Sequence, residues 1–503
     1  MDHTETELKL ALDAQALKRV PRVAAVAAAK RGRAQTKDLV STYYDTPDCV
    51  LRQAGLSLRL RRRGRDWIQT VKRSVVVHSG LFERHEWEIV LAQPGLNLPH
   101  LLSTGLDIFK QDELYPKLQP LFSTHVRRTT HILAGEGWEV ELALDHGRLV
   151  AGEREQAIAE IELEMRHGPA EMVFPLAHAI AAALPCQVLA QAKSDRGYDL
   201  AANTAPQSFK AKPLRLSADM ATGQAFAAIA RDCVGHLSAN QPAIAGPHAA
   251  EAVHQMRVAL RRLRSALKIF KPLLIGADMD GLRDQIRWVL SQLGPARDAE
   301  VFLTEIVAPV CADHAEAPAL TQLWQEFQRR RDAEVETASQ AVASTRFTLM
   351  LLELGRWSLC PTDMDSPQAQ VPLAGFARKV LRRQWRRVQK AGGKDLGHLP
   401  AEQLHQLRIL GKQLRYGAEF FASLYPKTKI KPLLTTLASL QQNLGELNDL
   451  AVAGPRLARS GQSASWGWAA GLICGWHETR RPLLMKAARQ DWKSLRKTTP
   501  PWD

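Results

Sequence analysis

Charged side chains recur at alternate positions in five segments of the first 200 residues. The five rows are Glu5/Glu7/Lys9, Arg59/Arg61, Arg84/Glu86/Glu88, Glu139/Glu141/Asp145 and Glu160/Glu162/Glu164. This spacing places the charges of each row on one face of a β-strand. Rows of carboxylates bind hard divalent cations, and clusters of arginine and lysine hold phosphoryl oxygens. The rows therefore predict a site that can stabilise the charge of a phosphoryl-transfer transition state.

A solvated outer face of a sheet is the other interpretation of such alternation, and for a single strand it is the more common one. Two rows argue against it for the set as a whole. Glu160/Glu162/Glu164 concentrates negative charge and Arg59/Arg61 concentrates positive charge, although like charges on one face repel unless a counter-ion lies among them. A closed barrel would turn these charges into a polar tunnel and leave apolar side chains outside, under helices.

Strands and a few helices must position these rows. Alternation of apolar and polar residues predicts strands over 56–61, 138–145 and 160–165, and helical patches are predicted around 13–30 and 173–184. The sequence has no GxxxxGK[ST] motif and no kinase-type glycine loop, so nucleotide binding by those routes is not expected.

A second set of ionisable residues lies in the other half of the chain, which has helical periodicity throughout. One helix stripe, spaced i, i+3, i+7 and i+10, consists of His254, Arg257, Arg261 and Arg264. The same pattern 151 residues later consists of His405, Arg408, Lys412 and Arg415. The segments 293–298 and 444–449 match at this offset, as do Arg231 and Arg382. A constant offset at three places predicts two copies of one helical unit about a pseudo-twofold axis.

A row of like charges on a helix is either a solvated stripe or the binding surface of a polyanion. Arg378, Arg382 and Arg386 add another basic helix face. Nucleic acid is not the polyanion that we expect, because only Tyr416 and Trp385 interleave the basic stripes and no RNA-binding signature is visible. A flexible phosphate chain without bases fits better.

The organisation of the chain separates the two sets of residues. At ~100–200 residues per domain, 503 residues divide into several compact units. Residues 201–213 lack periodicity and predict a linker, so we expect domains over 1–204 and 213–503, the second with repeat units over about 213–365 and 366–503. Helices are predicted there over 251–270, 376–390 and 400–424. The net charge of +15 resides in residues 201–503, because residues 1–200 contain equal numbers of basic and acidic side chains.

Cysteine usage and hydropathy predict a cellular location. The six cysteines are far apart and show no CxxC spacing, which indicates reduced thiols rather than a disulfide framework or a zinc site. The first residues have no signal-peptide pattern, and no apolar run reaches the ~18 residues of a membrane span. We therefore expect a cytoplasmic protein without a membrane partner.

The first half of the chain resembles the CYTH domain, the family of triphosphate tunnel metalloenzymes. Glu5-Thr-Glu7-Leu-Lys9 is similar to the ExExK signature of that family, and further motifs follow in the expected order over residues 3–200. These are Tyr43-Tyr-Asp-Thr-Pro47, Gly55-Leu-Ser-Leu-Arg59-Leu-Arg61, Thr70-Val-Lys72, Glu141-Leu-Ala-Leu-Asp145, Glu160-Ile-Glu-Leu-Glu164 and Lys193-Ser-Asp-Arg-Gly-Tyr198. The resemblance implies an α+β domain in which eight antiparallel strands close into a barrel around a tunnel, with flanking helices.

The resemblance also implies a role for individual residues. Mg²⁺ or Mn²⁺ would be held by Glu5, Glu7, Asp145, Glu160, Glu162 and Glu164. The catalytic carboxylates, one of which would activate the attacking water, are Glu5, Glu7, Glu162 and Glu164. The triphosphate would be bound by Lys9, Arg59, Arg61, Lys72, Arg84, Arg128 and Lys193. Many members of the family place a second basic residue two positions after Arg128, where this chain has Thr130.

Residues of about 215–490 resemble the CHAD domain, through the repeated His-x-x-Arg stripes and the LG(x)₃D elements. This resemblance implies an all-α domain of two pseudo-symmetric helical bundles around a basic groove that binds inorganic polyphosphate. The residues that would bind it are His254, Arg257, Arg261, Arg264, Arg382, His405, Arg408, Lys412 and Arg415.

The order of the two domains resembles that of bacterial inorganic triphosphatases with a C-terminal CHAD domain. The expected activity is metal-dependent hydrolysis of tripolyphosphate to pyrophosphate and phosphate, with polyphosphate as a second ligand. Two alternatives stay open. The tunnel could act on an organic triphosphate, as in a thiamine triphosphatase or a class IV adenylate cyclase, or the chain could be a non-catalytic polyphosphate-binding protein with a degenerate barrel.

Overall fold

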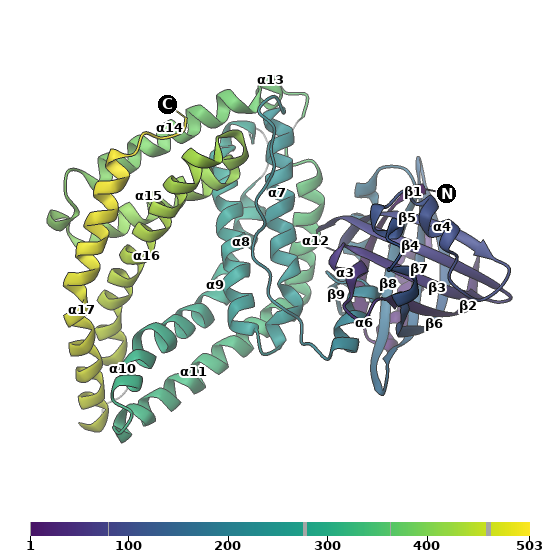
Figure 1. The fold of residues 1–503 in the computed structure, drawn as a ribbon, viewed down its shortest axis with the longest axis horizontal. Coiled ribbons are helices and arrows are strands. Elements are labelled where there is room, and N and C mark those ends of the chain that lie inside the picture. Colours follow the sequence, from purple (N-terminus) through teal and green to yellow (C-terminus); the bar gives the residue numbers. More distant parts are fainter. Residues whose placement is uncertain (1, 79, 275–278, 363, 459–463, 503) are drawn as a thin grey trace. The chain divides into compact units, whose positions relative to one another are not determined.

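The computed structural model describes residues 2–78, 80–274, 279–362, 364–458 and 464–502. The chain forms two compact units, and Figure 1 labels most of their helices and strands. Unit 1 comprises Met1–Phe209, Val234–His248 and Gln340–Leu359, and unit 2 comprises Lys210–Cys233, Ala249–Ser339 and Cys360–Asp503. Each unit is therefore assembled from three separate stretches of the sequence. Among the described residues, we find no helix whose length and hydropathy would let it span a lipid bilayer.

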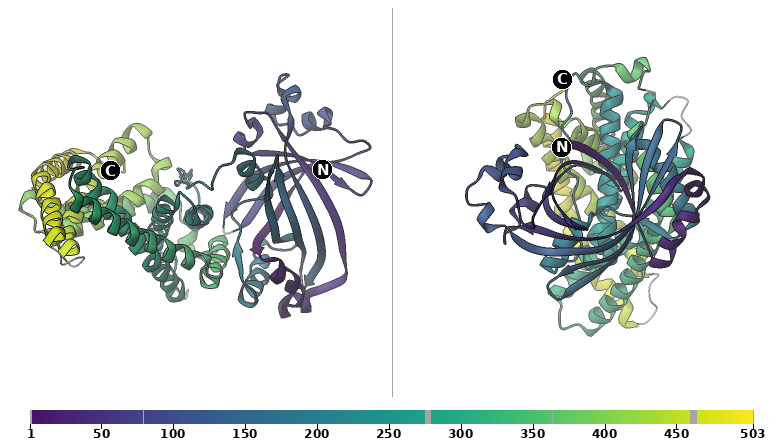
Figure 2. Two further views of the ribbon diagram at one scale, coloured as in Figure 1. Left: turned by 90° about the horizontal axis from the view of Figure 1, so that it is seen from below. Right: turned by 90° about the vertical axis from the view of Figure 1, so that its right-hand side faces the viewer.

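Unit 1 contains a closed antiparallel β-barrel, which Figure 2 shows from two further sides. Its strands are β1 (Asp2–Leu12), β2 (Lys30–Asp45), β3 (Leu56–Arg63), β4 (Asp66–His78), β5 (Leu81–Leu91), β6 (Gln119–Gly135), β7 (Trp138–Ala151) and β8 (Arg154–His167). Neighbouring strands pair in the order β5-β4-β3-β2-β6-β7-β8-β1, and pairing of β1 with β5 closes the ring. The short strand β9 (Cys186–Val188) adds to β1. The predicted eight-stranded antiparallel barrel is confirmed.

The alternation of the strands separates an apolar outside from a charged inside. On β1 and β8, Leu8, Leu10, Ile161 and Leu163 are fully buried, and helix α5 (Val173–Ala183) packs against both strands. The charged residues between them on the same strands point the other way, into the barrel. Other helices of this unit are α1 (Ala14–Arg19), α2 (Ala24–Ala29), α3 (Val50–Gln53), α4 (Leu98–Ser103) and α6 (Lys193–Ala202). The helical patch predicted around 13–30 is interrupted by the 3₁₀ turn Val20–Arg22, which contains Pro21.

A helix from far along the sequence also belongs to unit 1. Helix α12 (Thr345–Leu359) packs against α5 and β9. The Thr348 hydroxyl donates a hydrogen bond of 2.9 Å to the backbone carbonyl of Cys186. Thr348 and Phe347 have no exposed surface. The apolar surface of α5 is thus completed by residues about 170 positions later in the chain.

Unit 2 consists of helices. They are α8 (Ala249–Ile269), α9 (Asp280–Val301), α10 (Ala308–Asp313), α11 (Pro318–Ala343), α13 (Pro367–Gln370), α14 (Leu373–Gly392), α15 (Ala401–Phe420), α16 (Lys427–Ala458) and α17 (Ala464–Lys497), together with a π-helix over Phe302–Val307 and the first part of α7 (Thr222–Ala239). The helices predicted over 251–270, 376–390 and 400–424 correspond to α8, α14 and α15. The predicted all-α architecture of the C-terminal region is confirmed.

The two copies of the repeat occupy equivalent pairs of helices. Helix α8 packs against α9 and α15 packs against α16, and α8 and α15 also contact each other. Each pair carries one basic stripe on its first helix and one LG(x)₃D element on its second.

Candidate active site

A cavity of about 600 Å³ lies inside the barrel. Its charged lining residues are Glu5, Glu7, Lys9, Lys37, Arg59, Arg61, Arg63, Lys72, Arg84, Glu86, Glu88, Arg128, Glu141, Glu162, Glu164, Arg166 and Lys193. The other lining residues are Gln35, Leu39, Tyr43, Ser57, Val90, Thr130, Ala192 and Ser194. Ten basic and seven acidic side chains therefore line one cavity, which is the polar tunnel that the alternation predicts.

Acidic and basic residues occupy different walls of this tunnel. All seven carboxylates come from β7, β8, β1 and β5, which are consecutive in the barrel. The other four strands, β4, β3, β2 and β6, contribute no lining carboxylate, but carry Lys72, three arginines of β3, Lys37 and Arg128. A wall that can bind cations thus faces a wall that can bind anions.

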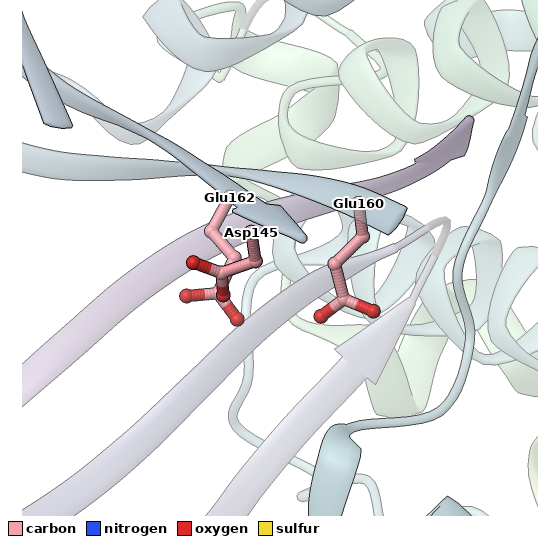
Figure 3. Close-up of side chains that lie close together, drawn as sticks. All are labelled: Asp145, Glu160 and Glu162. Atoms are coloured by element: carbon pink, nitrogen blue, oxygen red, sulfur yellow. The ribbon is translucent and has the colours of Figure 1, made fainter. Parts of the chain in front are cut away.

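Most of the predicted site residues meet in this tunnel. The four predicted catalytic carboxylates and all seven predicted triphosphate ligands line the cavity. Asp145 and Glu160 do not, since they are fully buried and contact Lys193, which does line the cavity. They form a cluster with Glu162, which does line the cavity, and Figure 3 shows the three side chains.

Asp145, Glu160 and Glu162 bring one carboxylate oxygen each within 4.8 Å of the others. The Lys193 ammonium already lies among them, 2.6 Å from Asp145 Oδ2, 2.5 Å from Glu160 Oε1 and 2.9 Å from Glu162 Oε1. This contact raises the pKa of Lys193 against the effect of burial. Arg128 pairs with Asp145 and Glu162, and Arg196 pairs with Glu160. Basic side chains thus neutralise this cluster in the structure.

A second group of carboxylates is less well neutralised. Glu164 lies opposite Glu7 and Glu141 in the strand register. Burial, and then the charges of Glu5 and Glu141, raise the pKa of Glu164 to about 8. The Arg166 guanidinium contacts Glu164 at 2.9 Å and Glu141 at 2.5 Å. Crowded carboxylates with this little positive charge are a donor set that suits a hard divalent cation.

On the opposite wall, arginines lie close to one another. Burial and the charges of Arg59 and Arg128 lower the pKa of Arg61 to about 10. Its Nε donates to the Ser41 hydroxyl at 3.0 Å, and no carboxylate of the described residues pairs with it. The Nε groups of Arg59 and Arg84 are buried and have no hydrogen-bond acceptor among the described residues. Donors arranged in this way suit an anion with several oxygens.

Two carboxylates of the tunnel have lowered pKa values. Lys193, Lys9 and Arg128 hold the pKa of Glu162 well below its usual range, despite burial. Lys72 and Arg59 lower the pKa of Glu86. Lys72 itself bridges Glu5 at 2.5 Å and Glu86 at 3.1 Å, across the closure between β1 and β5.

Several tunnel residues have no role assigned from the sequence, namely Lys37, Arg63, Glu86, Glu88, Glu141 and Arg166. Glu86, Glu88 and Glu141 belong to charged rows of the sequence analysis, which gave them no individual role, and strand parity could have added Arg63, which alternates with Arg61. Lys37 lies opposite Arg128 in the register of β2 and β6, which the sequence does not reveal.

In unit 2, the two basic stripes run along α8 and α15. Arg257 lies over Gly294 of α9, where an added Cβ would come 3.0 Å from Arg257 Nη1. Arg408 lies in the same way over Gly445 of α16, at 3.6 Å. The glycines of the LG(x)₃D elements thus leave room for the first arginine of each stripe.

The two stripes approach each other. The charges of Arg408, Arg261 and Arg415, added to burial, lower the pKa of Lys412 to about 7. Burial and nearby arginines likewise lower the pKa of His254 to about 4. His405 Nδ1 and Asn448 Oδ1 lie 3.0 Å apart. The Nε groups of Arg257, Arg261, Arg408 and Arg415 are buried without an acceptor among the described residues. Arg382, which is also predicted to bind polyphosphate, is on α14.

Known proteins resemble each half of the chain. The CYTH domain model matches residues 3–198, and the CHAD domain model matches residues 228–458. An inorganic triphosphatase of Haemophilus influenzae is 33% identical over 196 residues, which are 39% of this chain and 54% of that protein. The chain thus spans about half the length of this relative.

Two further relatives match more of the chain. An uncharacterised protein of Mycobacterium tuberculosis is 24% identical over 440 residues, or 81% of each chain. The crystal structure of the CHAD domain from the plant Ricinus communis is 32% identical, has a TM-score of 0.50, and covers 58% of this chain and 98% of that one. The chain therefore belongs to the CYTH-domain proteins and carries a CHAD domain on the C-terminal side of its CYTH domain.

Proposed function

We propose that the tunnel hydrolyses inorganic triphosphate to pyrophosphate and phosphate with the help of Mg²⁺ or Mn²⁺. The observation that carries this proposal is the division of the tunnel into two walls, one with seven carboxylates and one with basic side chains only. A triphosphate with its metal ion presents both charges at once, and would contact both walls. The likeness to an inorganic triphosphatase supports the same activity.

The lining of the tunnel supports an inorganic substrate over an organic one. Its side chains without charge are mostly small or polar, and Tyr43 is the one aromatic residue among them. The Tyr43 ring is 6% exposed, and one of its faces stacks on Phe122 with 4.6 Å between ring centroids. An adenine or thiamine ring would therefore find little aromatic surface in the cavity. We assign the thiamine triphosphatase and adenylate cyclase activities a lower rank for this reason.

We assign the metal ion to the acidic wall. Glu5, Glu141 and Glu164 are the crowded carboxylates, and Glu7 and Glu162 lie beside Glu164 and Lys9 in the register of β1 and β8. When bound, the ion would polarise the phosphoryl group and lower the pKa of the attacking water. Asp145 and Glu160 would serve a different purpose, which is to fix Lys193 and Arg128 for contact with phosphate.

Different residues of the tunnel would bind the substrate and accept the proton of the attacking water. Arg59, Arg61 and Lys72 hold the phosphate oxygens and neutralise the charge that builds up on them. A bond forms between the water oxygen and a terminal phosphorus, the bridging P–O bond breaks, and pyrophosphate leaves. One of Glu5, Glu7, Glu162 and Glu164 takes the proton of the water.

Steady-state hydrolysis of tripolyphosphate, ATP and thiamine triphosphate, each with Mg²⁺, with Mn²⁺ and with a chelator, tests this proposal. We expect the highest kcat/KM for tripolyphosphate and no turnover with the chelator. Turnover that survives chelation would exclude the metal role, and a higher kcat/KM for either organic compound would exclude the substrate assignment. Absence of hydrolysis for all three would support the non-catalytic alternative.

We further propose that the α8 and α15 stripes bind inorganic polyphosphate. Stripes that face each other with buried, unsatisfied guanidinium nitrogens, and a lysine whose pKa falls to about 7, describe a groove with excess positive charge. A phosphate polymer would relieve this repulsion and release its condensed cations. Charge reversal at Arg257 and Arg408 in the full chain should weaken binding of long-chain polyphosphate more than either change alone. Tripolyphosphate hydrolysis should stay unchanged, and a double variant with wild-type affinity would refute the groove.

A further inference from the structure

A third basic stripe lies on α17, outside the repeat. Lys486, Arg489, Lys493 and Arg496 have the spacing i, i+3, i+7 and i+10, the same as the stripes of α8 and α15. The four residues are exposed, and Lys497 follows them in the last turn. This spacing places the charges along one side of the helix, where like charges repel.

The stripe forms one side of a cavity of about 550 Å³. Lys394 and Asp395, which precede the 3₁₀ turn η8 (Leu396–His398), line the same cavity. Arg496 Nη1 donates to the Lys394 carbonyl at 2.8 Å, which ties the end of α17 to this segment.

Arg489 is held in a fixed position within the cavity. Its Nε and Nη2 donate to the two carboxylate oxygens of Asp395, at 2.8 Å and 2.5 Å. Its guanidinium also lies close to Gly397, where an added Cβ would come 3.2 Å from Arg489 Cζ. Part of the cavity wall is thus the guanidinium of Arg489, which packs on Gly397. Asp395 is the one carboxylate among the lining residues, and Arg489 already neutralises it.

Four lysines of the cavity have no acidic partner in the part of the chain that the structure describes. Among the described residues, no carboxylate pairs with Lys394, Lys486, Lys493 or Lys497. Asp491 lies on the same helix but accepts hydrogen bonds from Ser439 and Asn443. Positive charge therefore remains in excess, and an anion with several charges is its natural counterpart.

The cavity offers nothing on which a base could stack. Trp492 is the aromatic residue that lines it, but the side chain is only 1% exposed and packs against Gly392. Its indole Nε1 donates to the Gly393 carbonyl at 3.3 Å. Proteins that bind single-stranded nucleic acid use exposed aromatic rings for this purpose. The lining therefore suits a phosphate polymer without bases.

The geometry points to a second phosphate-polymer site, in which Lys394 and the α17 stripe contact inorganic polyphosphate separately from α8 and α15. This inference extends the polyphosphate binding proposed above and rests on it. The α17 cavity shares no lining residue with the stripes of α8 and α15.

The test compares four forms of the full-length protein, which are the wild type, K486E/K493E, R257E/R408E and the quadruple variant. The control is K18E/R22E, which makes the same change in net charge at exposed residues of unit 1. Binding of long-chain inorganic polyphosphate is titrated at several salt concentrations, and the helical circular dichroism and thermal unfolding of each form report that unit 2 is folded.

We expect K486E/K493E to bind more weakly. Its plot of log K against log salt should fall less steeply, with a slope smaller in magnitude by about two, or about one for each lysine. The control should keep the wild-type slope, and the quadruple variant should lose the binding that R257E/R408E retains. A wild-type slope and affinity in K486E/K493E would overturn the second site alone. No binding by the wild type would overturn the polyphosphate proposal as a whole. Displacement of polyphosphate from R257E/R408E by single-stranded RNA at equal phosphate concentration would also overturn the second site as a base-free one.

Discussion

Glu7 occupies a position between the two kinds of charge in the tunnel. It is only 2% exposed, and it accepts from Lys9 Nζ at 2.7 Å and from Arg84 Nη1 at 3.1 Å. Glu7→Gln should lower kcat for tripolyphosphate roughly 10²-fold or more, because an amide binds hard cations poorly and pairs weakly with arginine. Steady-state kinetics at saturating Mg²⁺ measures this change. Glu83→Gln, on the outer face of β5, is the matched control and should keep wild-type turnover. Near-native turnover of the Glu7 variant would remove Glu7 from the site.

Substitution of Arg61 tests whether the basic wall binds the substrate, and substitution of the neighbouring Arg62 is its control. Arg61 lines the tunnel, whereas Arg62 points outward and is exposed. Arg61→Ala should raise KM and lower kcat together, with a loss of about 2–4 kcal/mol in transition-state stabilisation, because the guanidinium holds phosphate in both states. Arg62→Ala should leave both constants unchanged. Equal kinetics for the two variants would show that Arg61 does not contact the substrate.

Strand parity explains which tunnel residues can be predicted from the sequence. Charged residues that alternate along one strand, such as Glu5 and Glu7, can be recognised as tunnel residues once the inner face of that strand is known. The basic partners of Asp145 and Glu160 cannot be identified in this way. Lys193 and Arg196 belong to α6, and only the tertiary structure brings them to the two carboxylates. Alternation therefore predicts the faces of the strands, but not which carboxylates are already neutralised.

At the scale of elements, the approach of α8 to α15 makes polyphosphate binding depend on pH. Lys412 has a pKa of about 7 in the free protein because of burial and neighbouring arginines. A bound polyanion favours the charged form and raises this pKa, so binding above pH 7 takes up a proton. Affinity should be constant at low pH and fall as pH rises from 7 to 9, by up to about tenfold per pH unit.

Titration calorimetry in buffers of different ionisation enthalpy measures this proton uptake directly. Lys412→Arg provides the control, since arginine stays charged over the whole range and should flatten the pH profile. A wild-type affinity that is the same at pH 6 and pH 9 would contradict the assignment of Lys412 to the groove.

The helices of the repeat were easier to predict than the stripe of α17. Two copies at an offset of 151 support each other, because the same spacing occurs in both. Lys486, Arg489, Lys493 and Arg496 have that spacing without a second copy, and a single basic stripe is ordinarily a solvated helix face. Only the cavity formed with Lys394 and Asp395 distinguishes it.

At the scale of the whole molecule, a protein that ends at residue 205 tests how far unit 1 depends on later segments. This form keeps every residue that lines the tunnel but lacks α12, which covers α5 and β9. We expect it to hydrolyse tripolyphosphate with a kcat similar to that of the full chain. Its barrel should melt roughly 5–10 °C lower and bind a hydrophobic dye, because apolar surface on α5 is uncovered. Thermal unfolding followed by circular dichroism measures the difference, and an unchanged melting temperature without dye binding would contradict the role of α12.

The sequence predicts a boundary between residues 204 and 213, and this boundary stays a prediction until that form is made. The membership of α12 in unit 1 could not be predicted. Its buried face, which includes Phe347 and Leu351, has the same three- to four-residue periodicity as helices that pack only on helices. Periodicity shows that a helix has an apolar face, but not which surface that face covers.

The position of α12 in the sequence has a consequence for synthesis on the ribosome. The barrel strands and α5 are complete by residue 202, whereas α12 ends about 150 residues later. At roughly 5–20 residues per second, the ribosome needs on the order of 10–30 s to add them. During this interval the nascent barrel presents bare α5 to the surrounding solution, next to the edge of β9. The nascent chain is therefore most open to association with other chains, and to chaperones, before residue 359 has left the ribosome.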